Sequence, residues 1–230
     1  MRFQVVGASV KGPAHEQDCQ PNQDAVGLAN NSKGCFAAVA DGLGSRKLSH
    51  LGSQRAVKIA HNILKNRSIV DASAMPARLS RAWRHSFKND FNDYETTCLW
   101  AKVNASGKGG VGQVGDGLVL LRQSGRFSVL TTQKDSFGNQ TTTLSQTESL
   151  TSDTADIQLT LPGDGVLLMT DGISDDLIPE QLEAFFDTIY NHQKRCSKRR
   201  MKRWLQAELK NWSTPRHGDD KTIASILKMD

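Results

Sequence analysis

The sequence predicts an α+β protein in which antiparallel β-sheets are covered by helices. Strand-like segments come first, followed by two helices, several further strands, two more helices and a final strand. This order lacks the regular alternation of strand and helix that a doubly wound parallel sheet requires. A chain of 230 residues is long enough to bury its own core, and we expect a single domain that spans residues 1–230.

The strands are predicted from short segments that alternate apolar and polar residues or are apolar throughout. Their expected ranges are 2–6, 25–29, 35–40, 98–104, 111–115, 118–121, 127–130, 157–161, 166–170 and 221–227. The glycine-rich segment 106–110 lies between two of them. Because Gly109 follows Lys108 where a phosphate-binding loop places Ser or Thr, we interpret this segment as a hairpin turn.

Two long helices are expected over residues 48–66 and 76–91, where apolar residues recur at helical spacing. The second begins at Pro76, and Trp83, Phe87 and Phe91 follow one another every fourth residue. We expect these aromatic side chains to belong to the core and not to a ligand-binding platform.

Two further helices precede the last strand, and the second of them is strongly basic. The first begins at Pro179. The second opens with the basic run 197–203 and carries an apolar stripe made of Met201, Trp204, Leu205, Leu209 and Trp212. The run is either the solvated face of a packed helix or a docking surface for an acidic or phosphorylated partner. No nucleic-acid partner is expected, because no groove pattern of aromatic and basic residues accompanies it.

The remaining features describe a loop and the cellular setting. Residues 134–155 are rich in Ser, Thr, Gln and Asn, which predicts a long loop or flap. The four cysteines, Cys19, Cys35, Cys98 and Cys196, show no paired spacing and indicate reduced thiols. No apolar run approaches the roughly 20 residues that cross a membrane, and no export signal is visible. A cytoplasmic protein without membrane contact is expected, and the sequence does not indicate its oligomeric state.

Four aspartates stand where apolar, strand-like segments begin or end: Asp41, Asp116, Asp171 and Asp219. The first three are each followed by glycine, and a single Asp-Gly pair is often only a turn. Three such pairs after buried-looking segments instead indicate an assembled acidic site. Converging carboxylates repel one another unless a cation lies between them, and oxygen ligands suit Mg²⁺ or Mn²⁺.

A series of motifs resembles those of the metal-dependent protein phosphatase 2C family, most closely its bacterial branch. They are Asn22-Gln-Asp-Ala25, Val39-Ala-Asp-Gly-Leu-Gly-Ser45, Thr96-Thr-Cys98 with Gly112-Gln-Val-Gly-Asp-Gly117, Met169-Thr-Asp-Gly-Ile-Ser-Asp175 and Gly218-Asp-Asp-Lys-Thr-Ile223. Their order and spacing match over almost the whole chain. The resemblance implies a central antiparallel β-sandwich flanked by helices on both faces.

The resemblance also implies a set of site residues. A binuclear Mg²⁺ or Mn²⁺ centre would be held by Asp24, Asp41, Asp171 and Asp219, together with the main-chain carbonyl of Gly42. Two further aspartates, Asp116 and Asp175, match the positions of a third, weaker ion. Two cations of this kind lower the pKa of water and hold phosphate oxygens during an in-line displacement.

The expected function is therefore that of a phosphoprotein phosphatase acting on phosphoserine or phosphothreonine. Gln23 stands where the family often has glutamate, and the arginine that commonly grips the substrate phosphate is not evident. Lys11, His15 and Arg46 are the candidates for that role, and His15 is alternatively a general acid or an ordinary loop histidine. These departures leave a second interpretation, a catalytically weak member that serves as a regulatory or binding module.

Overall fold

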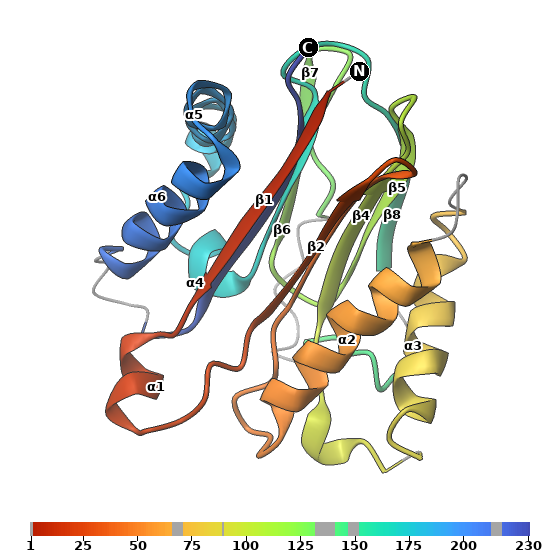
Figure 1. Ribbon diagram of the computed structural model, residues 1–230. Helices are drawn as coiled ribbons and strands as arrows, with labels where there is room; N and C mark the ends of the chain where they lie inside the picture. Colours follow the sequence, from red (N-terminus) through yellow and green to blue (C-terminus); the bar gives the residue numbers. More distant parts are fainter. Residues whose placement is uncertain (1, 66–70, 89, 132–140, 147–151, 213–217) are drawn as a thin grey trace.

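Two five-stranded antiparallel sheets lie face to face at the centre of the protein (Figure 1). The computed structural model describes residues 2–230 except 66–70, 89, 132–140, 147–151 and 213–217. The first sheet has the order β1 (Phe3–Val10), β10 (Lys221–Lys228), β9 (Gly165–Met169), β6 (Leu118–Gln123) and β7 (Arg126–Val129). The second has the order β2 (Ala25–Asn31), β3 (Gly34–Ala40), β4 (Cys98–Val103), β5 (Lys108–Val114) and β8 (Ser152–Gln158).

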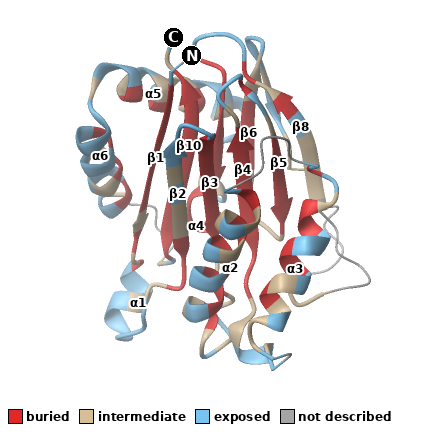
Figure 2. Ribbon diagram, turned by 45° about the vertical axis from the view of Figure 1, so that its right-hand side comes forward, coloured by how far each residue is buried: buried red, intermediate tan, exposed pale blue. Residues whose placement is uncertain are grey.

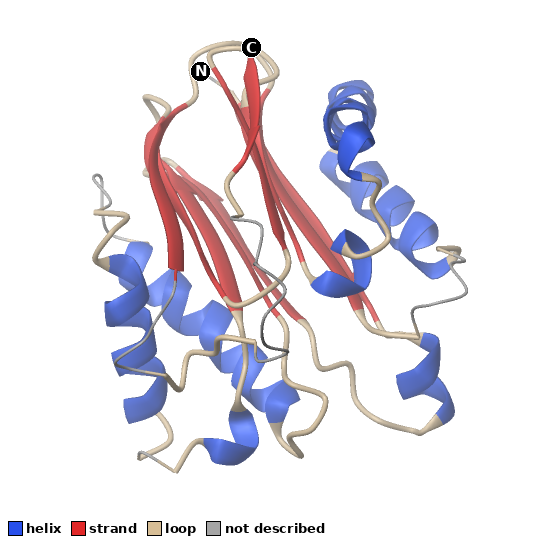
Figure 3. Ribbon diagram, turned by 180° about the vertical axis from the view of Figure 1, so that it is seen from behind, coloured by secondary structure: helices blue, strands red, loops and turns tan. Residues whose placement is uncertain are grey.

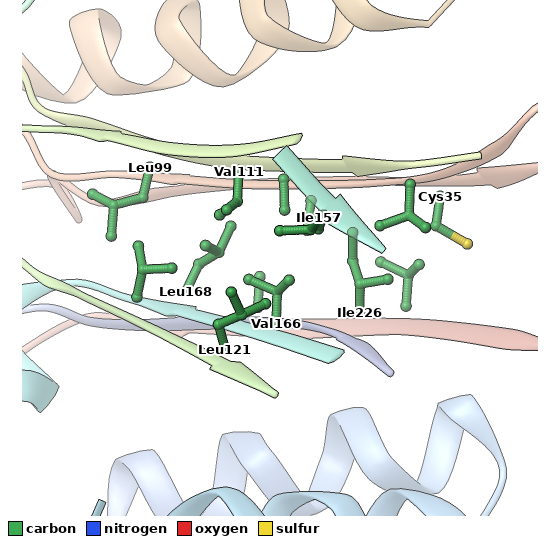
Figure 4. Close-up of a cluster of buried hydrophobic side chains, with 14 of the residues drawn as sticks. Cys35, Leu99, Val111, Leu121, Ile157, Val166, Leu168 and Ile226 are labelled. Atoms are coloured by element: carbon green, nitrogen blue, oxygen red, sulfur yellow. The ribbon is translucent and has the colours of Figure 1, made fainter. Parts of the chain in front are cut away.

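The inner faces of the two sheets form one hydrophobic core. Side chains from both sheets meet in it, among them Leu99, Val111, Val166 and Ile226 (Figure 4). In β3 the residues alternate, because 35, 37 and 39 face this core while 36, 38 and 40 face the helices. This strand, which has a neighbour on each side, is therefore buried throughout and reads as a continuous apolar run.

Helices cover the outer face of each sheet (Figure 3). On the second sheet lie α2 (Ser49–Leu64) and α3 (Met75–His85), whose Trp83 is fully buried. On the first lie α5 (Leu182–Arg195) and α6 (Lys198–Lys210), which bury Phe186 and Leu205. Shorter elements are α1 (Pro13–Gln17), α4 (Asp171–Ser174) and the 3-10 turns η1 (Asn92–Tyr94) and η2 (Pro179–Gln181). The predicted fold class, a β-sandwich with helices on both faces, is confirmed.

Several predicted boundaries are wrong. The helix expected over 76–91 ends at His85, because Lys88 adopts a left-handed φ of 53°. Phe87 and Phe91 still pack on Trp83, with ring centroids 5.1 and 6.0 Å from its own. They therefore belong to the core, as expected.

The predicted loop over 134–155 is also partly wrong, since β8 begins at Ser152. Most of the remaining segment lies outside the described residues. In the described part, Leu144 is fully buried and its amide donates to the carbonyl of Thr96 at 3.0 Å. The expected hairpin turn is confirmed, because β4 and β5 pair and Gly107 in the loop between them has a positive φ of 87°. Its predicted range of 106–110 is too long, since β5 already begins at Lys108.

All four cysteines are free thiols, and Cys35 and Cys98 are buried. Burial raises the pKa of the Cys98 thiol to about 12. None of the helices in the described part of the chain has the length and apolar composition to cross a membrane.

Candidate metal centre

Two of the predicted aspartates lie at one end of the second sheet. Asp24 directly precedes β2 and Asp41 directly follows β3. The two strands are antiparallel, with Ala25 opposite Ala40, so the start of one lies beside the end of the other. The register of this hairpin therefore brings the two carboxylates to the same edge.

The first sheet delivers two more carboxylates in the same way. Asp171 follows β9 and Asp219 precedes β10, and Met169 pairs with Ile223 where these strands meet. Asp116 lies on the connection between β5 of the second sheet and β6 of the first. The loops at this end of both sheets thus converge.

These loops enclose a cavity of about 230 Å³. It is lined by His15, Gln23, Asp41, Gly42, Leu43, Gly44, Thr97, Asp116, Thr141, Asp171 and Asp219. Asp24 is buried within the electrostatic reach of Asp171 and Asp41. The structure therefore brings together most of the residues that the sequence analysis selected, but Lys11, Arg46 and Asp175 are not among the lining residues.

Asp24 is the most deeply buried of these carboxylates. The hydroxyl of Thr170 donates to its Oδ2 at 2.8 Å, and its amide donates to Asn22 Oδ1 at 2.9 Å. Its other oxygen, Oδ1, is buried and has no hydrogen-bond partner among the described residues. Burial raises the pKa of Asp24 well above its usual value, and the charges of Asp220 and Asp171 raise it further.

Asp41 and Asp171 are a pair of interacting carboxyl groups. Burial raises the pKa of both, and neighbouring carboxylates add to the effect. Within the described part of the chain, Oδ1 of Asp171 is buried without a partner.

The donor set fits divalent cations. Two buried carboxylate oxygens lack partners in the described structure, and negative charges gather where burial penalises them. Carboxylate and carbonyl oxygens without sulfur ligands suit Mg²⁺ or Mn²⁺. Position 42 has room only for glycine, because a Cβ there would lie 2.6 Å from the carbonyl oxygen of Ser49.

Asp220 organises one wall of the cavity, although the sequence analysis gave it no role. Its side chain is 1% exposed. It accepts hydrogen bonds from the amides of Gly12 at 2.7 Å and Gln23 at 2.5 Å, and its Oδ2 lies 3.0 Å from His15 Nδ1. Only its position beside Asp219, directly before β10, could have indicated this. Asp220 thus holds α1 and the segment before β2 against the start of β10.

Arg46 is engaged outside the cavity lining. Its Nε and Nη2 both lie 2.6 Å from Glu95 Oε2, while Glu95 Oε1 accepts a hydrogen bond from Ser145 at 2.7 Å. No lysine or arginine lines the cavity in the described portion of the chain. The structure therefore places Arg46 in an ion pair and His15 at the cavity.

A family model described as Protein phosphatase 2C matches residues 11–210. The chain belongs to the protein phosphatase 2C family. A comparison with curated protein sequences finds no match.

Solved structures of bacterial phosphatases share the fold. The catalytic domain of the serine/threonine phosphatase PstP, in complex with two manganese ions, is 18% identical, with a TM-score of 0.68 and 99% of each chain covered. RsbX in complex with magnesium is 20% identical, with a TM-score of 0.65, and the match covers 98% of this chain and 96% of RsbX. PppA of Pseudomonas aeruginosa is 15% identical, with a TM-score of 0.65 and coverage of 99% and 98%. The expected resemblance to the bacterial branch is confirmed.

The raised pKa values predict how stability depends on pH without metal. Between the ordinary carboxyl pKa of about 3.9 and the raised values, the folded protein binds more protons than the unfolded chain at Asp24, Asp41 and Asp171. Their contribution to stability is complete below the ordinary pKa and is lost as the pH rises through the raised values. With chelator present, the melting temperature should fall as the pH rises from about 4 towards neutrality, and Mn²⁺ should restore it at the higher pH. The double variant Asp41→Asn/Asp171→Asn should show a smaller fall, and an equal fall would contradict the assignment.

Proposed function

We propose that this protein is a metal-dependent phosphoprotein phosphatase that hydrolyses phosphoserine and phosphothreonine. The observation that carries the proposal is the convergence of Asp41, Asp171 and Asp219 on one cavity, with Asp24 buried beside it. Membership of the protein phosphatase 2C family supports the reaction class. The manganese and magnesium in the structures of PstP and RsbX support the choice of cofactor.

The proposed metal ligands are those that the family resemblance implies, and the donor atoms at the cavity fit them. Asp24, Asp41, Asp171 and Asp219, with the Gly42 carbonyl, would hold two Mg²⁺ or Mn²⁺ ions. Divalent cations in such a site lower the pKa of water and stabilise the charge that develops on phosphate oxygens. The protein fixes the ligands through its own hydrogen bonds: the Thr170 hydroxyl donates to Asp24 Oδ2, and the Asp41 amide donates to Thr97 Oγ1 at 3.0 Å.

His15 is proposed to supply the proton that the leaving alkoxide takes up when the phosphorus–oxygen bond breaks. It lines the cavity, and Asp220 lies against its Nδ1. Asp220 Oδ2, 3.0 Å from Nδ1, holds that side of the ring, which leaves Nε2 to act as the acid. Asp220 is then a positioning residue, itself held by the amides of Gly12 and Gln23.

Arg46 remains a candidate to bind the substrate phosphate. To do so, its guanidinium must leave the ion pair with Glu95 and pair with the phosphate. The alternative function, a catalytically weak regulatory or binding module, is favoured by one observation: no basic side chain of the described residues other than His15 lines the cavity. Gln23, a neutral residue in the lining, points the same way.

A phosphatase assay separates the two functions. Hydrolysis of an aryl phosphate and of a phosphothreonine peptide is measured with Mn²⁺, with Mg²⁺ and with chelator. Turnover of both substrates that requires a divalent cation is expected. Absence of turnover in a folded protein that binds Mn²⁺ would favour the binding module instead.

The third-ion residues give a separate prediction. Asp116 and Asp175 both lie within the electrostatic reach of Asp171. Asp175 comes one helical turn after Asp171, and the Asp175 amide donates to the Asp171 carbonyl oxygen at 3.0 Å. Replacing Asp116 or Asp175 by alanine should lower turnover about 10-fold to 100-fold while leaving the tightest Mn²⁺ binding unchanged in calorimetric titration. If Asp175→Ala changes neither turnover nor its dependence on metal concentration, Asp175 serves only the local helix.

A further inference from the structure

The positive charge of the chain is concentrated in one short segment. Residues 194–203 hold seven of the 29 lysines and arginines and none of the 24 aspartates and glutamates. The rest of the chain, with 22 basic and 24 acidic residues, carries a net charge of −2. The seven exposed side chains, which we name the basic face, are Lys194, Arg195, Lys198, Arg199, Arg200, Lys202 and Arg203.

The basic face has no counter-charge within the described protein. None of its seven residues forms a salt bridge with another described residue. Arg122, which lies under α5, is by contrast paired with both Glu183 and Asp187. The charges of the basic face thus repel one another without a carboxylate to neutralise them in the described structure.

These charges do not serve the stability of α6. The helix packs through Met201, Leu205 and Leu209, which are buried on its opposite side (Figure 2). Its first turn contains no acidic residue, so lysine and arginine stand where the positive end of the helix dipole disfavours them. A basic surface that opposes the stability of its own helix is better explained by a partner than by solvation alone.

The surroundings of the basic face indicate the chemistry of that partner. The large apolar residues that are exposed in the described structure, such as Leu28 and Ile178, belong to other elements, so α6 offers no anchor for a membrane. Trp204 is stacked on His192 at 3.9 Å and offers no free ring on which a base could stack. Glu208, an exposed acid further along α6, would repel a large polyanion that extends along the helix, such as duplex DNA.

We propose that the basic face docks a short acidic segment of a partner protein. Five of the charges lie within Lys198 to Arg203, six residues that rise about 9 Å along the first turns of α6, a length that about three residues of extended chain cover. Lys194 and Arg195 lie at the end of α5. The start of α6, which carries most of the basic face, lies next to α5 (Figure 1). From there the helix runs along β1 towards the end of the sandwich where α1 and α4 border the cavity. The docking surface is therefore separate from the cavity. The proposal rests on charge and burial and not on the phosphatase activity.

Two matched triple variants test the proposal. Arg199→Glu/Lys202→Glu/Arg203→Glu reverses three charges of the basic face, and Lys58→Glu/Arg78→Glu/Arg81→Glu reverses three exposed charges on α2 and α3. Both change the net charge equally. Glutamates near the start of α6 suit the helix dipole, so the first variant should fold, as a melting curve will show.

The probe is a fluorescently labelled peptide of alternating Glu and Ser, and its binding is followed by anisotropy at low ionic strength. We expect the α6 variant to weaken binding at least about tenfold and the control variant to have little effect. Both variants should retain aryl phosphate turnover. Equal weakening by both would overturn the proposal, because net charge alone would then explain binding. Tighter binding of duplex DNA or of phosphatidylserine vesicles than of the peptide would overturn the partner class, and loss of aryl phosphate turnover in the α6 variant would overturn the separation from the cavity.

Discussion

Replacing Asp41 or Asp171 by asparagine is expected to abolish phosphatase turnover while the fold survives. Each change removes a charged ligand of the proposed metal centre but keeps the volume of the side chain. A loss of about 4 kcal/mol in transition-state stabilisation corresponds to roughly a thousandfold lower kcat/KM. Because burial and neighbouring carboxylates raise the pKa of both groups, the metal-free variants should also melt at a higher temperature than the wild type at neutral pH.

The measurement is kcat/KM for a phosphothreonine peptide with saturating Mn²⁺, together with melting curves with and without the metal. Asp187→Asn is the matched control, because Asp187 on α5 pairs with Arg122 and does not line the cavity. It should leave turnover unchanged. An Asp41 or Asp171 variant with near-normal Mn²⁺-dependent turnover would exclude that residue from the centre.

Replacing His15 by glutamine is expected to slow the hydrolysis of substrates with poor leaving groups much more than that of substrates with good ones. A phosphothreonine peptide releases an alkoxide that needs a proton, whereas p-nitrophenyl phosphate releases a stable anion. Loss of a general acid typically costs about 10²-fold to 10⁴-fold, and we expect a loss in this range for the peptide only. The readout is the ratio of kcat values for the two substrates.

His85→Gln is the control for this experiment, since His85 is an exposed residue at the end of α3. Asp220→Asn should shift the kcat ratio in the same direction as His15→Gln. It should also lower stability, because an amide group would face the N–H of Gly12 or Gln23. Equal slowing of both substrates by His15→Gln would show that the histidine does not act as the acid.

The fold could be predicted from the sequence where local pattern and burial agree. The apolar run over 35–40 is buried on both faces in the structure. Leu79 and Trp83, which are four residues apart on one face of a helix, both lie in the core. The helix α1 was missed because it has only five residues, too few for a periodic pattern. Its position depends on distant contacts: the Ala14 amide donates to the Gly218 carbonyl, and a Cβ at Gly12 would lie 2.2 Å from the same oxygen.

The site could be predicted in part for the same reason. Strand ends mark Asp41 and Asp171, and the face-to-face packing of the two sheets brings these ends to one cavity. The role of Asp220 depends on the amides of Gly12 and Gln23, which are 208 and 197 residues away in the sequence. The pairing of Arg46 with Glu95 likewise joins residues 49 positions apart. No local pattern encodes such contacts, so they become visible only in the folded chain.

Anomalous diffraction from crystals soaked in Mn²⁺ tests the central claim most directly. The account predicts two strong manganese peaks, coordinated by Asp24, Asp41, Asp171 and Asp219. A different outcome is conceivable, since the ligand atoms of His15, Asp219 and Asp220 lie within 4.8 Å of one another. A single peak among those three residues, or no peak at the cavity, would contradict the proposed centre.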